Sequence, residues 1–212
     1  MKKTLLTLIG TVLAVSAMAQ GTLNFGNSTA NVFRNPIYDV NPAAPGTSQS
    51  GQSALGFPAG STVYGGALLQ GTNYVMALYA GPANTTDASL LTFVTSGTFR
   101  TATGNGLPAG LISTVFDVPI QGVAAGSTAT LEVRVWDIRT GPQGGGFANA
   151  GTTGRSGLFQ SQPLGGIGPA GPVLTPDMTG WSSFSVSAVP EPASFALAGL
   201  GAAALMIFRR RK

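Results

Sequence analysis

Residues 128–136 of the chain read Thr-Ala-Thr-Leu-Glu-Val-Arg-Val-Trp, and this stretch decides the fold class. Its side chains alternate with a period of two. One set consists of Leu131, Val133 and Val135, and the other of Glu132, Arg134 and Trp136. Because successive side chains of a strand point to opposite faces, this alternation predicts a strand with one face in an apolar core.

Several other short runs carry β-branched and aromatic residues between turn-forming residues. The candidate strands are residues 21–25, 61–64, 73–80, 111–118 and 181–188. Residues 73–80 are apolar on both faces, as expected of a central strand. Residues 89–94 lead through Ser96-Gly97 into 98–100, which predicts a hairpin. In 111–118 the alternation puts Ile112, Thr114, Phe116 and Val118 on one face.

The chain is unusually rich in residues that interrupt secondary structure, with 31 glycines and 14 prolines among 212 residues. Together with about seven or eight candidate strands and no convincing helix in residues 20–188, this predicts an all-β domain. A two-sheet β-sandwich, of the jelly-roll or immunoglobulin-like type, is the expected architecture. Residues 41–60 and 140–171 are expected to be long loops, either binding elements or poorly ordered.

The first 19 residues have the pattern of an export signal. Lys2 and Lys3 are followed by a mostly apolar stretch, residues 5–17, and by the small-x-small triplet Ala17-Met18-Ala19. We expect a signal peptide over residues 1–19, helical in its apolar part, with cleavage after Ala19.

The C-terminal segment, residues 189–212, has the pattern of a membrane anchor. Val189-Pro190-Glu191-Pro192 precedes the uncharged residues 193–208, and Arg209, Arg210, Arg211 and Lys212 follow. As a helix, residues 193–208 would be about 24 Å long, short for a hydrocarbon core of about 30 Å. Such a helix can still cross if the arginines snorkel to the interface. The sequence therefore predicts a single transmembrane helix with its basic end in the cytoplasm.

This order of elements resembles the PEP-CTERM sorting signal of Gram-negative bacteria. The resemblance implies that a membrane-embedded exosortase recognises Pro190, Glu191 and Pro192, cuts near them, and passes the protein to the cell surface or extracellular matrix. Arg209–Lys212 correspond to the basic stop. The implied partners are the exosortase, the export machinery and, transiently, the inner membrane. A permanent, uncut anchor is the alternative.

The residues between the two ends resemble, more loosely, a recurrent type of PEP-CTERM surface protein. The resemblance is carried by residues 21–25, 78–82 and 134–137 (Gly-Thr-Leu-Asn-Phe, Leu-Tyr-Ala-Gly-Pro and Arg-Val-Trp-Asp). It implies fold and location, and no activity.

The basic balance of the whole chain, with a formal charge of +4, belongs to its ends. Six of the 11 cations lie in residues 1–19 and 189–212, so residues 20–188 hold five arginines against six carboxylates, a net charge of −1. A nucleic-acid partner is not expected, because clustered cations are needed to displace counterions from phosphates. Cysteine is absent, so the domain has no disulfides.

Few residues offer chemistry. The chain has neither histidine nor cysteine, which excludes histidine-based triads, thiol nucleophiles and zinc sites of the usual kind. Residues 166–171 match G-x-G-x-x-G, but prolines surround them and no strand–helix context is apparent, so we treat the match as chance. Asp117, Glu132 and Asp137 are candidates for an acid pair of the glycosidase type, although a paired surface face explains them more simply.

We therefore expect an exported, non-enzymatic surface or matrix protein with no catalytic residue, metal or cofactor. The opposed hypothesis is a carbohydrate-binding or weakly hydrolytic module with exopolysaccharide as its ligand. It would use aromatic side chains from the set Phe33, Tyr38, Tyr64, Tyr79, Trp136 and Trp181. An exposed Trp136 or Trp181 beside a carboxylate would favour the sugar module. Burial of both, without a cleft lined by two acids, would favour the first hypothesis.

Overall fold

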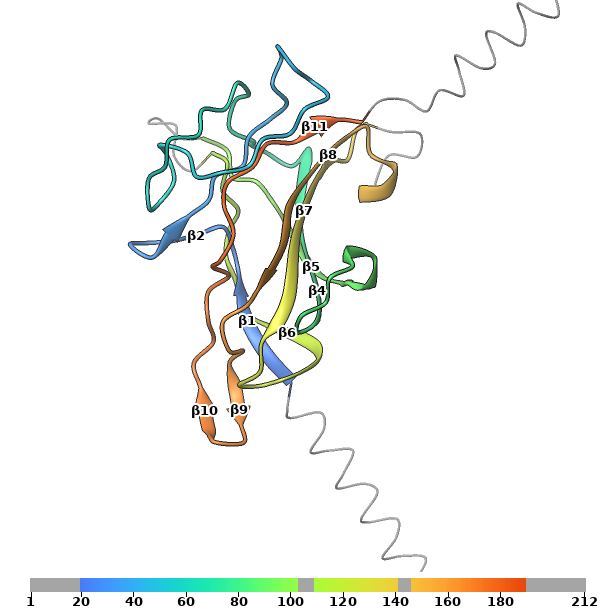
Figure 1. Cartoon of the computed structure of the whole chain (residues 1–212). Coiled ribbons are helices and arrows are strands. Elements are labelled where there is room, and N and C mark those ends of the chain that lie inside the picture. The colour runs from blue at the N-terminus through green and yellow to red at the C-terminus, as the bar shows by residue number, and fades with distance from the viewer. Residues whose placement is uncertain (1–19, 103–108, 141–145, 190–212) are drawn as a thin grey trace, which may run out of the picture.

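The computed structural model describes residues 20–102, 109–140 and 146–189, which form an all-β body (Figure 1). The strands are β1 (Gln20–Phe25), β2 (Ser28–Thr29), β3 (Phe33–Arg34), β4 (Tyr74–Pro82), β5 (Thr92–Thr98), β6 (Val115–Ala124), β7 (Ala129–Asp137), β8 (Thr152–Gln160), β9 (Gly166–Gly168), β10 (Gly171–Val173) and β11 (Ser187–Ala188). Two 3-10 turns, η1 (Ala88–Leu90) and η2 (Phe147–Asn149), are the helical elements of the described ranges. The all-β prediction is confirmed.

The largest sheet has five antiparallel strands in the order β11-β8-β7-β4-β5. The stretch that decided the fold class forms its middle strand, β7. β7 pairs with β4 along an unbroken register from Tyr74 opposite Asp137 to Pro82 opposite Ala129. Every residue of β7 except Arg134 is buried, because strands and loops cover both of its faces.

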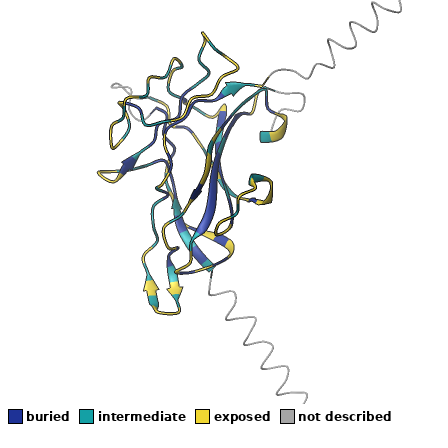
Figure 2. Ribbon diagram, viewed as in Figure 1, coloured by how far each residue is buried: buried dark blue, intermediate teal, exposed yellow. Residues whose placement is uncertain are grey.

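A second layer covers one face of this sheet. It consists of the antiparallel pair β1–β6 and of extended segments joined to it by single bridges, such as Asn24 to Asp177 and Tyr38 to Ser185. The main core lies between the layers, where Figure 2 shows the buried strands. Its largest fully buried side chains include Phe25, Phe184, Leu23, Ile37, Leu69, Met76, Leu78, Ile120 and Leu131.

A smaller apolar cluster lies on the opposite face of the five-stranded sheet. Ala77, Trp136 and Ala150 are buried there, with Val75, Tyr79 and Phe147 packed against them. The alternation predicted for β7 is thus confirmed, since Leu131, Val133 and Val135 belong to the main core and Trp136 to the outer cluster.

The hairpin predicted for residues 89–100 is wrong. Ala88–Leu90 form η1, which Asp87 caps by accepting a hydrogen bond from the Ser89 amide at 2.8 Å. The residues from Thr92 to Thr98 then form one strand, β5, paired with β4. Gly97 lies inside the strand opposite Met76, so the Ser96-Gly97 pair does not make a turn.

The common face predicted for residues 111–118 is also wrong at Phe116. Ile112 and Val118 are buried, but Phe116 is 70% exposed. Asp117 has a φ of 54°, and the register between β1 and β6 shifts at this point, with Leu23 opposite Val118 but Phe25 opposite Val115. The extra residue of this bulge rotates Phe116 to the outside.

Two loop and strand predictions differ from the structure. The expected loop 140–171 contains β8, which pairs with β7, and the β9–β10 hairpin begins within it. Its glycines and Arg155 hide the alternation of β8. Residues 61–64, expected as a strand, contribute only a bridge between Thr62 and Ser53.

The last expected strand, 181–188, is reduced to β11 at its end and to bridges at Phe184 and Ser185. Phe184 and Val186 of this segment are buried in the main core.

The first and last strands of the described body lie apart in the view of Figure 1, β1 in its lower half and β11 near the top. Within the described residues, no helix has the length and apolar character needed to cross a membrane. The signal helix within residues 1–19 and the transmembrane helix at 193–208 lie outside these residues.

Candidate functional site

The predicted sorting residues adjoin the body directly. Pro190, Glu191, Pro192 and the basic stop Arg209–Lys212 lie outside the described residues, as do Ala17 and Ala19 of the predicted signal cleavage site. The preceding residues are fixed to the body. The Ala188 amide donates to the Pro45 carbonyl at 2.7 Å, and the Val189 amide donates to the Gly151 carbonyl at 2.8 Å. Hydrogen bonds therefore hold the chain to the body up to the residue before the Pro-Glu-Pro triplet.

The three candidate acids are not brought together. Glu132 and Asp137 are five residues apart on β7, about 16 Å along the strand, and an odd spacing puts them on opposite faces. Asp117 lies on β6 in the other layer and accepts a hydrogen bond from the Thr175 hydroxyl at 2.6 Å. These acids therefore do not form the pair that glycoside hydrolysis requires, in which the two carboxyl groups are about 5–10 Å apart.

Glu132 is held in a buried ion pair on the outer face of the sheet. The Arg134 Nε donates to its carboxylate, and the Arg155 guanidinium lies 3.6 Å from it. Arg134 also donates to the Ala88 carbonyl at 2.7 Å and stacks 3.9 Å from the ring centre of Tyr79. Each oxygen of the carboxylate thus faces a guanidinium. The pairing suggested by the sequence is present, but Glu132 is buried and does not lie on a surface face.

Asp137 is occupied in a similar way at the end of β7. Arg139 donates to it from Nε at 3.0 Å and from Nη2 at 2.7 Å. Burial by itself raises the pKa of Asp137, but the hydrogen bonds from Arg139 outweigh it and hold the pKa below its ordinary value. The neighbouring Tyr74 has a raised pKa because it is buried and because its hydroxyl donates a hydrogen bond to the Asp39 carboxylate at 2.8 Å.

Both tryptophans are buried, and each residue has 9% of its surface exposed. Trp181 packs on Phe159 and Phe184 and donates from Nε1 to the Met178 carbonyl at 2.8 Å. Trp136 meets Phe147 edge to face, and its Nε1 has no hydrogen-bond partner among the described residues.

The other aromatic candidates are engaged too. Phe33 and Tyr38 are buried, and Tyr64 stacks on Tyr38 with ring centres 4.1 Å apart. Tyr79 carries the guanidinium of Arg134 on its ring. The predicted aromatic set therefore provides no free stacking platform within the described body.

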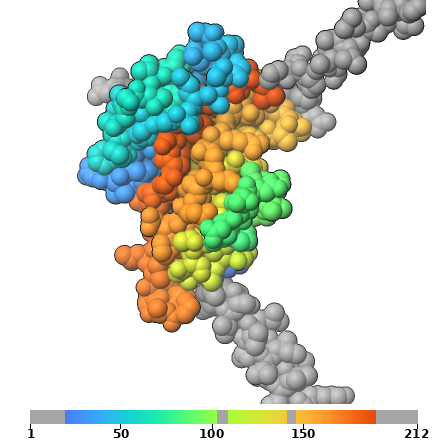
Figure 3. Space-filling model, viewed as in Figure 1, coloured from blue at the N-terminus to red at the C-terminus, as the bar shows by residue number. Residues whose placement is uncertain are grey.

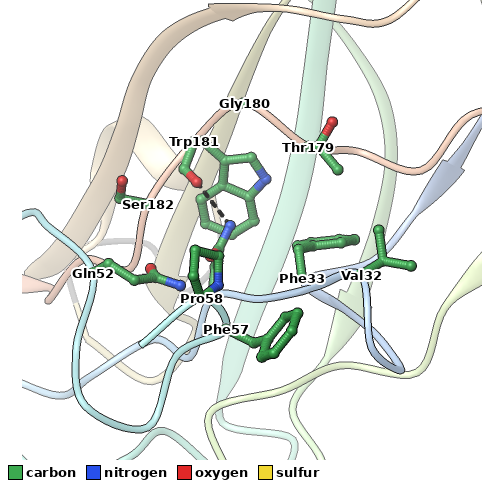
Figure 4. A pocket seen from close by; sticks show the side chains of 10 residues that line it. Val32, Phe33, Gln52, Phe57, Pro58, Thr179, Gly180, Trp181 and Ser182 are labelled. Atoms are coloured by element: carbon green, nitrogen blue, oxygen red, sulfur yellow. Dashed lines mark hydrogen bonds between the residues drawn. The ribbon is translucent and has the colours of Figure 1, made fainter. Parts of the chain in front are cut away.

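A shallow cleft of about 300 Å³, lined in part by Phe33 and Trp181 of the aromatic set, lies where three segments meet (Figure 4). Its lining residues are all uncharged: Val32, Phe33, Asn35, Gln52, Phe57, Pro58, Thr179, Gly180, Trp181 and Ser182. Phe57 is 46% exposed at its rim. Sequence reasoning missed Phe57 and Gln52, although both belong to the loop 41–60 that it marked as a potential binding element.

Hydrogen bonds fix the walls of this cleft. The Asn35 side chain donates to the Trp181 carbonyl at 2.8 Å, the bond drawn dashed in Figure 4. The Gln52 amide donates to the Arg34 carbonyl at 2.8 Å, and its oxygen accepts from Ser183. The hydroxyls of Thr179 and Ser182 form no hydrogen bond to another residue of the described ranges and are available to a ligand or water. The cleft can thus offer hydroxyls and apolar surface, but no charge.

The literal G-x-G-x-x-G match at residues 166–171 is part of the β9–β10 hairpin, in which Gly171 lies opposite Gly168. No helix follows it in the described ranges, and the prediction that this match is fortuitous is supported.

Comparison with known proteins gives one result at the C-terminus. Residues 188–212 match the family model described as the PEP-CTERM protein-sorting motif. No curated protein and no solved structure matches the chain. The body is therefore interpreted from its own geometry, and the chain is identified by its C-terminal segment as one that carries a PEP-CTERM protein-sorting motif.

Proposed function

We propose that this chain is an exported, non-enzymatic protein of the cell surface or extracellular matrix of a Gram-negative bacterium. An exosortase-type system sorts it through the Pro-Glu-Pro motif, the apolar segment 193–208 and the basic tail. The observation that carries the proposal is the match of residues 188–212 to the PEP-CTERM sorting motif. In this proposal residues 20–188 form a two-layer β-sandwich that serves a structural or adhesive role, and the precursor is transiently anchored in the inner membrane.

The body supports a role without catalysis. The candidate acids are dispersed, and Glu132 and Asp137 are neutralised by arginines. An acid that hydrolyses a glycosidic bond must be free to exchange a proton with its substrate, and these carboxylates are already bound to cations. Burial of both tryptophans likewise favours this proposal over a sugar site built on them.

The test is a substitution in the sorting motif of the full-length chain. Glu191→Ala should leave an uncut precursor in the inner membrane, because the residue that the exosortase reads is missing. Ser194→Ala, three positions further on, is the matched control and should mature normally. Processing of Glu191→Ala at the normal rate would contradict the proposal, and a wild-type protein that remains uncut would indicate a permanent anchor.

The second candidate function is binding of a neutral carbohydrate, with exopolysaccharide as ligand. The cleft at Phe57 favours it, because an uncharged lining with hydroxyls and an exposed ring suits a sugar with an apolar face. The test is affinity electrophoresis of the mature protein in gels that contain matrix polysaccharide. Phe57→Ala should abolish retardation, whereas Val63→Ala, at a position that is 82% exposed outside the cleft, should not. Equal mobility of all three proteins with and without polysaccharide would eliminate this function.

A further inference from the structure

One edge of the five-stranded sheet is open. β5 is the last strand on that side, and its residues Thr92–Thr98 (Thr-Phe-Val-Thr-Ser-Gly-Thr) include no charged residue and no proline. Natural sheets usually shield an exposed edge with lysine, proline or a covering segment, because unpaired amides and carbonyls pair readily with another strand. Within the described residues, no strand pairs with the outer side of β5.

The other edge of the same sheet is closed. Its terminal strand, β11, has only two residues, and the amide of one of them, Ala188, donates to the Pro45 carbonyl. Ser185, two residues before β11, is bound to Gln49 through both its backbone and its side chain. The chain thus shields one edge by shortening and covering it. At the other edge, Phe99 and Arg100, directly after β5, pair with Ile112 and Leu111, and the seven residues of β5 itself stay available.

Exposed apolar side chains accompany the open edge. Phe93 of β5 is 56% exposed, and Val115 and Phe116 of β6 are 41% and 70% exposed. A groove of about 330 Å³ joins them, lined by residues 93–95 of β5 and by residues 115–119 and Gln121 of β6. In Figure 3 the chain near residue 90, in green, lies on the surface beside that near residue 120, in yellow-green. We call β5 together with Val115 and Phe116 the β5 edge.

We propose that two copies of this chain associate through the β5 edge, with β5 antiparallel to β5 about a two-fold axis near Thr95. About a two-fold axis, residue i of one copy lies opposite residue j of the other and residue j opposite residue i, so a charged edge would bring like charges together near the axis and repel its copy. The β5 strand carries no charge. Asp117 lines the groove but belongs to β6, where its carboxylate accepts a hydrogen bond from the Thr175 hydroxyl. A charged partner would find no counter-charge on β5, whereas an identical neutral strand loses nothing electrostatically and covers the exposed phenylalanines of both copies.

The size of the contact suggests when it forms. Seven residues span about 23 Å, and the two layers with their side chains are about 20 Å deep, so each copy would bury roughly 450 Å². The total of about 900 Å² is below the roughly 1,200 Å² of most stable complexes, so the pair should be weak in dilute solution. It would form where copies are concentrated. In this respect the inference rests on the proposed delivery of the chain to one surface.

Cysteine cross-linking of the full-length chain tests the pairing, because the natural sequence has no cysteine. Thr95→Cys and Ser96→Cys put a thiol near the axis, and directly opposed antiparallel positions have the Cα separation that a disulfide requires. Diamide supplies the oxidant. At equal surface amounts, one of these variants should yield at least about fivefold more covalent dimer than Val63→Cys, which is highly exposed elsewhere.

A second substitution distinguishes pairing from chance collision. Ser96→Lys, added to Thr95→Cys, puts like charges across the axis and should reduce the dimer at least about fivefold, while Val63→Lys should not. The proposal would be overturned if Thr95→Cys and Ser96→Cys both yielded no more covalent dimer than Val63→Cys. So would a cross-link to a different protein, recognised by its mass. The amount of protein in the surface fraction reports delivery separately, so a failure of sorting is not mistaken for a failure of pairing.

Discussion

The buried ion pair on β7 makes a quantitative prediction about stability. Glu132 is 3% exposed at its side chain, Arg134 is 12% exposed, and Arg155 is 51% exposed. Glu132→Ala would leave the Arg134 guanidinium desolvated between Tyr79 and Phe147 without its carboxylate. Removal of one member of a buried pair costs about 3–5 kcal/mol, because the other charge stays buried.

The lower end of that range applies here. Arg134 would keep its hydrogen bond to the Ala88 carbonyl and its contact with the Tyr79 ring, so we expect a loss of about 3 kcal/mol for Glu132→Ala. Arg155→Ala removes the exposed member of the group at 3.6 Å, and such exposed pairs contribute less than about 1 kcal/mol. Glu132→Gln, which keeps an acceptor but no charge, should be intermediate.

Urea unfolding of residues 20–189, followed by tryptophan fluorescence, measures these differences, since Trp136 lies on the same face of β7. With a slope of about 2 kcal/mol per molar urea, Glu132→Ala should lower the midpoint by about 1.5 M and Arg155→Ala by less than about 0.5 M. Equal shifts for the two alanine variants would refute the reasoning, because they would show that Arg134 reaches water without its partner.

Two further predictions concern the body. Because the folded-state pKa of Asp137 is lowered, its carboxylate stabilises the fold fully above its unfolded pKa of about 4 and loses this contribution as the pH falls through the folded pKa. Lowering the pH from about 5 to about 2 should therefore reduce the stability of Asp137→Asn less than that of the wild type, as measured by urea midpoints. Parallel plots of midpoint against pH for the two proteins would contradict this prediction. Gly66→Ala would place a Cβ 2.0 Å from the Asp39 carbonyl oxygen and should cost at least about 1 kcal/mol, whereas Gly46→Ala meets nothing within 4 Å and should change the thermal midpoint little. Similar midpoints for these two variants would be inconsistent with the packing described.

The strands that were predictable from sequence are those in which side-chain alternation and burial coincide. β7 and β1 alternate clearly, and both were located within two residues of their actual limits. β4 was recognised because its neighbours and the layers on both faces make it apolar throughout. These strands contribute ten of the 23 buried residues of the main core, and the all-β class followed from them.

The remaining strands depend on tertiary contacts that a local pattern does not carry. β8 contains Gly154 and Gly157, and its side chains do not alternate clearly. It is a strand because its backbone pairs with that of β7 through antiparallel hydrogen bonds. The Cβ of an alanine at Gly154 would lie 3.0 Å from the Phe184 ring, so close packing requires the glycine that hides the pattern. The bulge at Asp117, which exposes Phe116, likewise comes from pairing with β1.

The candidate sites differ in the same way. The sorting segment was readable because its signal is local: a motif, an apolar stretch and a basic end in succession. The cleft was not, since Val32, Gln52 and Trp181 come from three distant segments and meet only in the folded protein. The tryptophans attracted attention as possible sugar platforms, and the structure places both in apolar clusters instead.

The central claim is that the C-terminal segment directs this chain to the surface and is removed on the way. Intact-mass measurement of the wild-type protein recovered from the cell surface tests it most directly. We predict a chain that lacks residues 1–19 and the apolar segment 193–208 with its basic tail. Surface protein whose mass includes every residue to Lys212 would contradict the claim.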